Sequence, residues 1–305
     1  MGELYLEYEY WVAVFQLFTA MLGMGATLTL RDFREVLIEP KAVSIGTVIQ
    51  LVLVPLVAGG FIAAFGLTAG IAVGLALIAA IPGGTVSNIF TFFARGNVAL
   101  SITITALTTL ACLFTTPLIL ELLITEYMPA DFVMPRMRIM TEIALALLLP
   151  LAIGMVILKL MPSIAEAFSK WCVRASLFGI VLIVVGSASS GRLDFAAFGA
   201  TNVAITAGLV VVLMLAGWVA TKAARLSSPD QSAITIEVTV RNINLGVMLK
   251  ASLFPAAAAA SDPIGDTVLF ALLLYGSLQL LLATGLIALG RRGARQRAEA
   301  PMQAG

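Results

Sequence analysis

The sequence predicts an all-α polytopic membrane protein with about nine transmembrane helices. Of its 305 residues, 60% are hydrophobic and only 11% are charged, a composition typical of a chain that lies almost entirely in a lipid bilayer. The hydrophobic residues form segments of about 20 or more, the length that crosses ~30 Å of hydrocarbon. Two of these segments carry helix-breaking and polar residues, at 81–91 and 237–246. Paired interruptions of this kind indicate a transporter built from discontinuous helices.

The hydrophobic segments define one transmembrane unit over residues 1–290, with short connectors between the spans. Residues 291–305 follow as a basic tail that we predict to be cytoplasmic and disordered. The third and eighth spans are the interrupted ones, and they run in opposite directions because an odd number of crossings separates them. This arrangement is what an inverted-topology repeat requires. The expected spans are 10–29, 42–66, 69–94, 98–125, 138–160, 171–190, 196–221, 230–254 and 265–290.

The distribution of Lys and Arg predicts the orientation in an inner or plasma membrane. With the N-terminus outside, the outer loops hold only Arg136, Arg138 and Arg192 of the 18 basic residues. Two more, Arg241 and Lys250, lie within the eighth span, and the other 13 fall in the inner loops and the tail. Cytoplasmic loops are enriched in positive charge, so we expect the N-terminus outside and the C-terminus in the cytoplasm.

Several classes of function are excluded by what the sequence lacks. The chain has no histidine, which rules out histidine metal sites and proton relays, and no nucleophile–base pair indicates an enzyme. No basic face that could follow nucleic-acid phosphates is present. Cys112 and Cys172 lie in or beside apolar spans and are expected to be packing residues. Glu142 and Lys250 lie nearer the ends of their spans, so we expect them to extend toward the interface as structural residues. Nothing in the sequence indicates an oligomeric state.

The first interruption, IPGGTVSNIFT at 81–91, combines helix breakers with oxygen-bearing side chains. Pro82, Gly83 and Gly84 leave backbone amides and carbonyls free, and such a break survives in hydrocarbon only where protein or a water-filled cavity surrounds it. Side-chain oxygens at the start of the following half-helix suit either an anion near the helix N-terminus or a hard cation. The side chains that supply them are Thr85, Ser87 and Asn88.

Two neighbouring spans add polar candidates. Ser101 and Thr105 are four residues apart and therefore lie on one helix face. Gln50 lies in the middle of the second span. The alternative for all three is a packing role, because small polar residues and single amides also join membrane helices.

The second interruption, EVTVRNINLG at 237–246, contains ionisable residues inside the membrane. Glu237 lies about seven residues into its span, at ~10 Å depth from a rise of 1.5 Å per residue. An ionisable group at that depth is costly and indicates a functional site. Arg241 follows at i+4, and a mutually neutralising pair that only joins two helices is the alternative. Asn242 and Asn244 add further polar atoms that need partners.

These stretches resemble the bile acid:sodium symporter family. The segments LGMGATLTLRDF, PGGTVSNIFTFFARGNVALS and IEVTVRNINLGV, together with Gln50, follow that family's patterns in order and with matching spacing. The resemblance covers essentially the full length. It implies a panel domain, a core domain with two crossed discontinuous helices, and sodium-coupled import of an organic anion.

Carried over by position, the resemblance assigns two sodium sites and a substrate site. The first sodium site falls on Ser87, Asn88, Ser101, Thr105 and Glu237. The second falls on Gln50, Glu237, the carbonyls of Val238 and Val240, and position 241. The substrate-facing positions are Thr85 and Asn242.

Position 241 departs from the family pattern, which usually has glutamine there. Arg241 has five donors and no acceptor and stays charged, so it cannot bind sodium. It either replaces the second ion or holds a substrate carboxylate through two parallel hydrogen bonds. We therefore expect a symporter for Na⁺ and a small organic anion, such as a keto acid, a hydroxy acid, a pantoate-like compound or a bile-acid-like compound. A sodium-independent carrier and a channel-like protein of the same fold are the alternatives.

Overall fold

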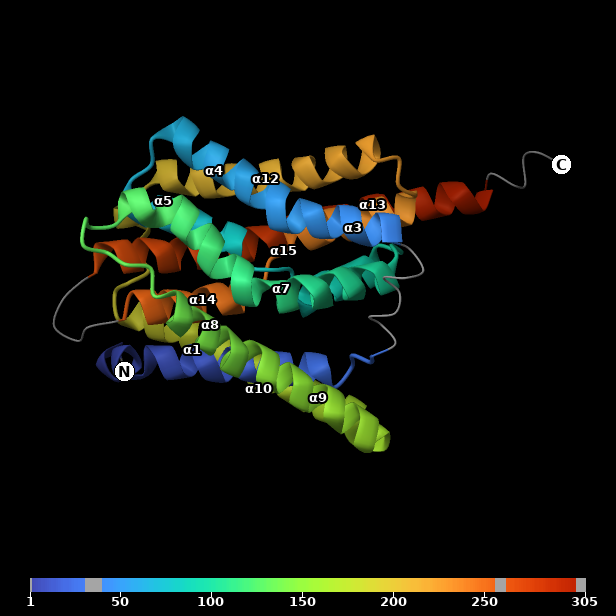
Figure 1. Ribbon diagram of the computed structural model, residues 1–305, viewed down its shortest axis with the longest axis horizontal. Coiled ribbons are helices and arrows are strands. Elements are labelled where there is room, and N and C mark those ends of the chain that lie inside the picture. The colour runs from blue at the N-terminus through green and yellow to red at the C-terminus, as the bar shows by residue number, and fades with distance from the viewer. Residues whose placement is uncertain (1, 31–39, 256–261, 300–305) are drawn as a thin grey trace.

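The computed structural model describes residues 2–30, 40–255 and 262–299 (Figure 1). Within these ranges the regular elements are helices, apart from one isolated β-bridge. They are α1 (Gly2–Gly25), α3 (Pro40–Val48), η2 (Ile49–Leu53), α4 (Val54–Phe65), α5 (Ala69–Ala80), α6 (Thr85–Phe93), α7 (Val98–Ile124), η3 (Thr125–Tyr127), α8 (Arg136–Ile143), η4 (Ala144–Leu148), α9 (Leu149–Leu160), α10 (Pro162–Ser189), α11 (Phe195–Phe198), α12 (Ala200–Ala223), α13 (Ser228–Thr239), α14 (Ile243–Leu253) and α15 (Pro263–Glu299).

Six continuous helices within the described residues are long and apolar enough to cross a bilayer. Two of them contain a π-helical segment, η2 within Pro40–Phe65 and η4 within Arg136–Leu160. A proline follows each segment at the start of the next α-helical stretch, Pro55 in α4 and Pro150 in α9. Proline lacks an N–H and its ring crowds the preceding turn, so a locally wider turn keeps the span continuous. The six spans are Pro40–Phe65, Val98–Tyr127, Arg136–Leu160, Pro162–Ser189, Ala200–Ala223 and Pro263–Arg292.

The two ends of the chain differ from the predicted span limits. Helix α1 begins at Gly2, eight residues before the predicted span 10–29, and it carries Glu3, Glu7 and Glu9, so it is less apolar than the six spans. Helix α15 continues to Glu299, so the expected disorder from residue 291 is wrong up to that residue. Residues 300–305, and the loop charges Arg31 and Arg34, lie outside the described residues.

Both interrupted spans are discontinuous helices, as predicted. The first is α5 and α6, separated by four residues, and the second is α13 and α14, separated by three. Nearly every residue of α5 is buried, between α4, α7 and α15. The break in the backbone is therefore surrounded by protein, the condition under which irregular backbone is tolerated at membrane depth.

The helices pack as two groups, which we call the panel and the core. The panel consists of α1, α8, η4, α9 and α10, with α1 lying along α10 and against α9 in the lower part of Figure 1. The core consists of α3 to α7 and α12 to α15, in which α15 packs on α5 and α12 on α13. Helix α1 packs on α14 across the boundary between the groups, and α7 meets α8. The boundary between panel and core therefore runs beside α14.

Candidate ion and substrate site

The two interruptions cross each other inside the core. Gly83 and Arg241 form the antiparallel bridge, and the Asn242 N–H donates to the Pro82 carbonyl over 2.8 Å. These contacts satisfy backbone groups that helix ends leave free. Gly83 has no room for a side chain, because a Cβ there would overlap with a carboxylate oxygen of Glu237. The crossing therefore brings the two breaks, which are far apart in sequence, into one site.

Glu237 lies near the end of α13, is fully buried and accepts three hydroxyl hydrogen bonds. Its Oε2 accepts from Ser87 Oγ at 2.5 Å and from Ser101 Oγ at 3.0 Å. Its Oε1 accepts from Thr105 Oγ1 at 2.5 Å. The hydroxyls of Ser101 and Thr105 also lie 2.8 and 3.1 Å from Oδ1 of Asn88. All five residues assigned to the first sodium site thus come together, and their role in ion binding stays a prediction. We call them the Glu237 cluster.

Helix positions explain this convergence. Helix α6 begins at Thr85, so Ser87 lies in its first turn, where exposed N–H groups and the helix dipole favour the carboxylate of Glu237. Thr91, which was not predicted, lies one turn after Ser87 on the same face, and its hydroxyl is 3.3 Å from Ser101 Oγ. The i+4 spacing from Ser87 was the signal that could have identified Thr91.

The guanidinium of Arg241 points to the C-terminal end of α5. Its Nη1 donates to Oε1 of Gln50, and its Nε donates to the Ile78 carbonyl over 3.3 Å. Its Nη2 donates to the Ala79 carbonyl over 3.2 Å and to the Ile81 carbonyl. Carbonyls at a helix C-terminus carry partial negative charge, so this end of α5 is a favourable place for a cation. Arg241 is 3% exposed, which means that the protein supplies most of its partners.

Arg241 and Glu237 do not form a direct ion pair among the described residues, so the pairing weighed from the sequence is absent there. Gln50 connects the two, because its Nε2 lies 3.4 Å from the Glu237 backbone carbonyl while its Oε1 accepts from Arg241. Val238 and Val240 are fully buried, but their carbonyls are not acceptors of the guanidinium. The carbonyls that surround this position come from α5 instead.

Two residues of α15 that were not predicted hold the second interruption in place. Gln279 accepts from the Arg241 N–H at 2.8 Å and donates to the Arg241 carbonyl over 3.2 Å. The Tyr275 hydroxyl donates to the Thr239 carbonyl over 2.9 Å. These side chains take the place of helical partners for the broken backbone.

A cavity of about 530 Å³ lies beside the crossing, between α1 and α10 of the panel and α14 and α15 of the core. Its lining is mostly apolar, with polar atoms from Gln16, Asn244, Gln279 and Arg241. A largely apolar cavity with a few polar groups is the usual form of a small-molecule site.

Of the three positions predicted to face the substrate, Arg241 lines this cavity, whereas Thr85 and Asn242 adjoin it without lining it. Thr85 is half-buried at the start of α6, and its neighbour Val86 contributes to the lining. Asn242 caps α14, with its Oδ1 accepting from the Leu245 N–H at 3.4 Å, and its neighbour Ile243 lines the cavity. The N-terminus of α14 thus begins at the cavity wall.

The expectation that Lys250 extends to the interface is wrong. Its side chain is fully buried, and its Nζ donates to Glu9 over 2.9 Å. Glu142, with an 11% exposed side chain, pairs with Arg138 and accepts from Ser252 at 2.7 Å. Lys250 stays inside because Glu9 of α1 supplies a buried partner for its charge. The sequence alone does not place α1 next to α14.

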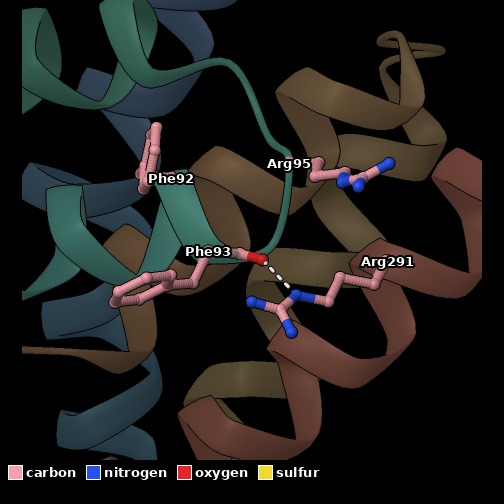
Figure 2. A pocket seen from close by; sticks show the side chains of 4 residues that line it. All are labelled: Phe92, Phe93, Arg95 and Arg291. Atoms are coloured by element: carbon pink, nitrogen blue, oxygen red, sulfur yellow. Dashed lines mark hydrogen bonds between the residues drawn. The ribbon is translucent and has the colours of Figure 1, made fainter.

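A second hollow lies where α6 ends, at the opposite end of that helix from the crossing (Figure 2). Phe92, Phe93, Arg95 and Arg291 line it, and the Arg291 Nε donates to the Phe93 carbonyl over 2.8 Å. All four side chains are exposed. Exposed charges are solvated and need no internal partner, so we place the candidate site at the crossing and not here.

Comparison with known proteins identifies the family. Residues 14–198, more than half of the chain, match the model of the Sodium Bile acid symporter family. The chain belongs to this family. It is a multi-pass membrane protein of a transporter family and not an enzyme.

Individual relatives are similar over most of the chain. An uncharacterized sodium-dependent transporter, YocS, of Bacillus subtilis is 34% identical over 245 residues, which cover 80% of this chain and 75% of the relative. The probable chloroplastic sodium/metabolite cotransporter BASS1 of Oryza sativa is 34% identical over 252 residues, 77% of this chain and 57% of the relative. The protein of the same name from Arabidopsis thaliana is 32% identical over 230 residues, 75% of this chain and 56% of the relative. The chain thus spans less than two thirds of the matched plant proteins.

Proposed function

We propose that the protein is a secondary transporter that couples sodium entry to the uptake of a small organic anion. The observation that carries the proposal is the Glu237 cluster, in which side chains from α6, α7 and α13 converge on one fully buried carboxylate. A buried carboxylate without a nearby cation is costly, so the cluster has a reason to bind one. The names of the relatives, which describe sodium-dependent transport, agree with this assignment.

The chemistry of the cluster suits sodium. It offers hydroxyl, amide and carboxylate oxygens and neither nitrogen nor sulfur ligands, the set that hard cations prefer. The hydroxyls of Ser87, Ser101 and Thr105 now donate to Glu237, but each retains lone pairs and can rotate to present them. A sodium ion among them would take over the charge that these three donors now stabilise.

The guanidinium of Arg241 supports a single sodium site. Four of its N–H groups already have protein acceptors: Gln50 and the three carbonyls at the end of α5. These acceptors surround a position that suits a cation, and the guanidinium of Arg241 occupies it. A guanidinium committed to the protein in this way is poorly placed to hold a substrate carboxylate as well, so we favour ion replacement over a substrate clamp. One sodium per cycle follows.

The cavity beside the crossing is the proposed substrate site. It adjoins the N-terminus of α14, where the helix dipole attracts an anion. Gln16 and Asn244 offer hydrogen bonds to hydroxyl or carbonyl groups, and apolar side chains cover the rest. This lining suits a small keto or hydroxy acid with a short apolar part. We further propose, from the Lys and Arg distribution, that the end where α1 begins faces outward.

Sodium-dependent thermal stability of the purified protein tests the cation site. We expect unfolding at a higher temperature in sodium chloride than in choline chloride at equal ionic strength. Glu237→Gln should abolish the difference, because an amide removes the charge that the ion balances. Glu166→Gln is the matched control, since Glu166 is exposed and its ion-pair partner among the described residues is Lys170. Equal stabilisation of Glu237→Gln and the wild type by sodium would disprove the assignment.

Counterflow in proteoliposomes separates a carrier from a channel-like protein of the same fold. Only a carrier exchanges labelled for unlabelled substrate without net current. A screen of keto and hydroxy acids for stabilisation in the presence of sodium supplies the substrate for this assay.

A further inference from the structure

Four charged side chains meet at the end of the bundle where α1 and α15 begin, on the left of Figure 1. Glu9 of α1 and Arg192, just after α10, belong to the panel. Lys250 of α14 and Asp266 of α15 belong to the core. We call these residues the charged cluster. The proposed function uses none of them.

Two of the three ion pairs in the charged cluster join the panel to the core. Glu9 Oε1 accepts from Lys250 Nζ at 2.9 Å, and Arg192 Nε pairs with Asp266. The third pair, at 2.9 Å between Arg192 Nη1 and Glu9 Oε1, lies within the panel. Two positive and two negative charges make the cluster neutral. Its charges are balanced by protein partners only while panel and core are in contact.

Burial makes these contacts sensitive to separation. The side chains of Glu9 and Lys250 are 2% and 0% exposed, and that of Arg192 is 7% exposed. Buried ion pairs contribute little net stability against their desolvation, so water can replace the partners at small cost once the interface opens. Glu9 Oε2 is buried and has no hydrogen-bond partner among the described residues, so the closed arrangement is not fully satisfied.

The charged cluster lies beyond the cavity, along its two walls. On α1, Glu9 precedes the cavity residue Gln16 by seven positions, two turns or ~10 Å along the same face. On α14, Lys250 follows the cavity residue Val247 by three positions, one turn. The cluster therefore joins the panel wall to the core wall at this end of the cavity.

A separate contact joins the panel and the core at the same end. Ser252 of α14 donates to Glu142, which lies in α8, over 2.7 Å. Ser252 follows Lys250 by two residues, so successive positions of α14 contact two different panel helices. The end of α14 is thus held to the panel by hydrogen bonds and ion pairs as well as by apolar packing.

We propose that the charged cluster is an ionic latch that closes the cavity at this end, and that it opens when the panel and the core separate. In the closed state Lys250 and Asp266 neutralise panel charges; in the open state the same four groups are hydrated. The latch rests on alternating access, which belongs to the proposed function, but its test requires neither sodium nor substrate.

Distances between spin labels test the latch in the full chain, in a cysteine-free background. Cysteines at Leu4 of α1 and Phe65 of α4, both exposed, report the separation of panel and core at this end. Lys250→Met should increase the population of a second, longer distance at least tenfold. The control pair, Leu4 and Val185, lies within the panel, and its distance should not change.

Cysteine labelling gives an independent measurement. Val247 is 3% exposed, so a cysteine there should react slowly with an impermeant maleimide while the latch is closed. We expect Lys250→Met and Asp266→Asn each to raise the rate at least tenfold. Asp266→Asn, at a 25% exposed side chain, is the milder change and decides the question if Lys250→Met alters the control distance. An unchanged distance distribution, or rates within twofold of the parent in a variant that keeps the control distance, would overturn the proposal.

Discussion

Arg241→Gln separates the two roles that a guanidinium at this position could have. The substitution removes the donors to Gln50 and to the carbonyls of Ile78, Ala79 and Ile81. A buried polar group without a partner costs ~1–3 kcal/mol. Water can enter the vacated space and satisfy part of this set, so we expect a loss of about 3–5 kcal/mol without sodium, less than the sum for four unpaired acceptors.

Sodium should restore much of this stability in the variant, because glutamine adds a neutral oxygen to carbonyls that already face the vacated position. Ligand binding at 100 times the dissociation constant stabilises a protein by ~2.7 kcal/mol. A change of 1 kcal/mol shifts the midpoint by roughly 2–4 °C for 150 to 250 residues and by less for longer chains. With 305 residues, we therefore expect an additional sodium-dependent shift of about 5 °C. Thermal unfolding in sodium chloride and in choline chloride measures this shift.

Uptake measurements count the ions. The wild type should show a Hill coefficient for sodium near one, and Arg241→Gln should raise it toward two while keeping the substrate. Arg241→Lys is the matched control, because it retains the positive charge near the C-terminus of α5 and should keep a coefficient near one. A wild-type coefficient close to two would refute the single-site reasoning. Loss of substrate affinity in Arg241→Gln at every sodium concentration would show instead that the arginine holds the substrate.

Three further predictions concern the site and the topology. Ser101→Ala combined with Thr105→Ala should raise the sodium concentration for half-maximal uptake about tenfold with normal expression, and wild-type behaviour would mean that both are packing residues. Gly83→Ala should abolish sodium-dependent stabilisation, because the added methyl group overlaps with the carboxylate of the cluster; a stabilisation equal to that of the wild type would contradict this. Arg95→Cys and Glu126→Cys, exposed near opposite ends of α7, should react with an impermeant maleimide only from inside and only from outside, respectively. Labelling of Arg95→Cys from outside would reverse the proposed orientation.

Much of the core could be predicted from the sequence because its determinants are local. The consecutive proline and two glycines at 82–84 interrupt the helix between α5 and α6, and polar residues follow them at helical spacing. Glu237 needs oxygen partners at its depth in the membrane, and few other side chains can supply them. The convergence of Ser87, Ser101 and Thr105 on Glu237 follows from these constraints once the two breaks cross.

Features that depend on distant residues were not predictable. The direction of the Arg241 side chain depends on the carbonyls at the end of α5, whose position relative to α13 is set by the whole core. Lys250 was expected at the interface because its partner, Glu9, lies 241 residues away in the chain. The contact of Gln279 with the second interruption was not predicted, because a single amide in an apolar span is also typical of ordinary helix packing.

If the guanidinium at the end of α5 replaces a sodium ion, as we propose, it also sets the energetics of accumulation. It moves with the protein and returns, so over a complete cycle it carries no net charge across the membrane. In the proposed cycle one sodium ion and one monovalent anion would enter together as an electroneutral pair, and a tenfold sodium gradient would support at most a tenfold anion gradient. A second sodium would add the membrane potential, ~2.3 kcal/mol per charge at 100 mV. Uptake by this protein should therefore not change when a potassium diffusion potential is imposed with valinomycin.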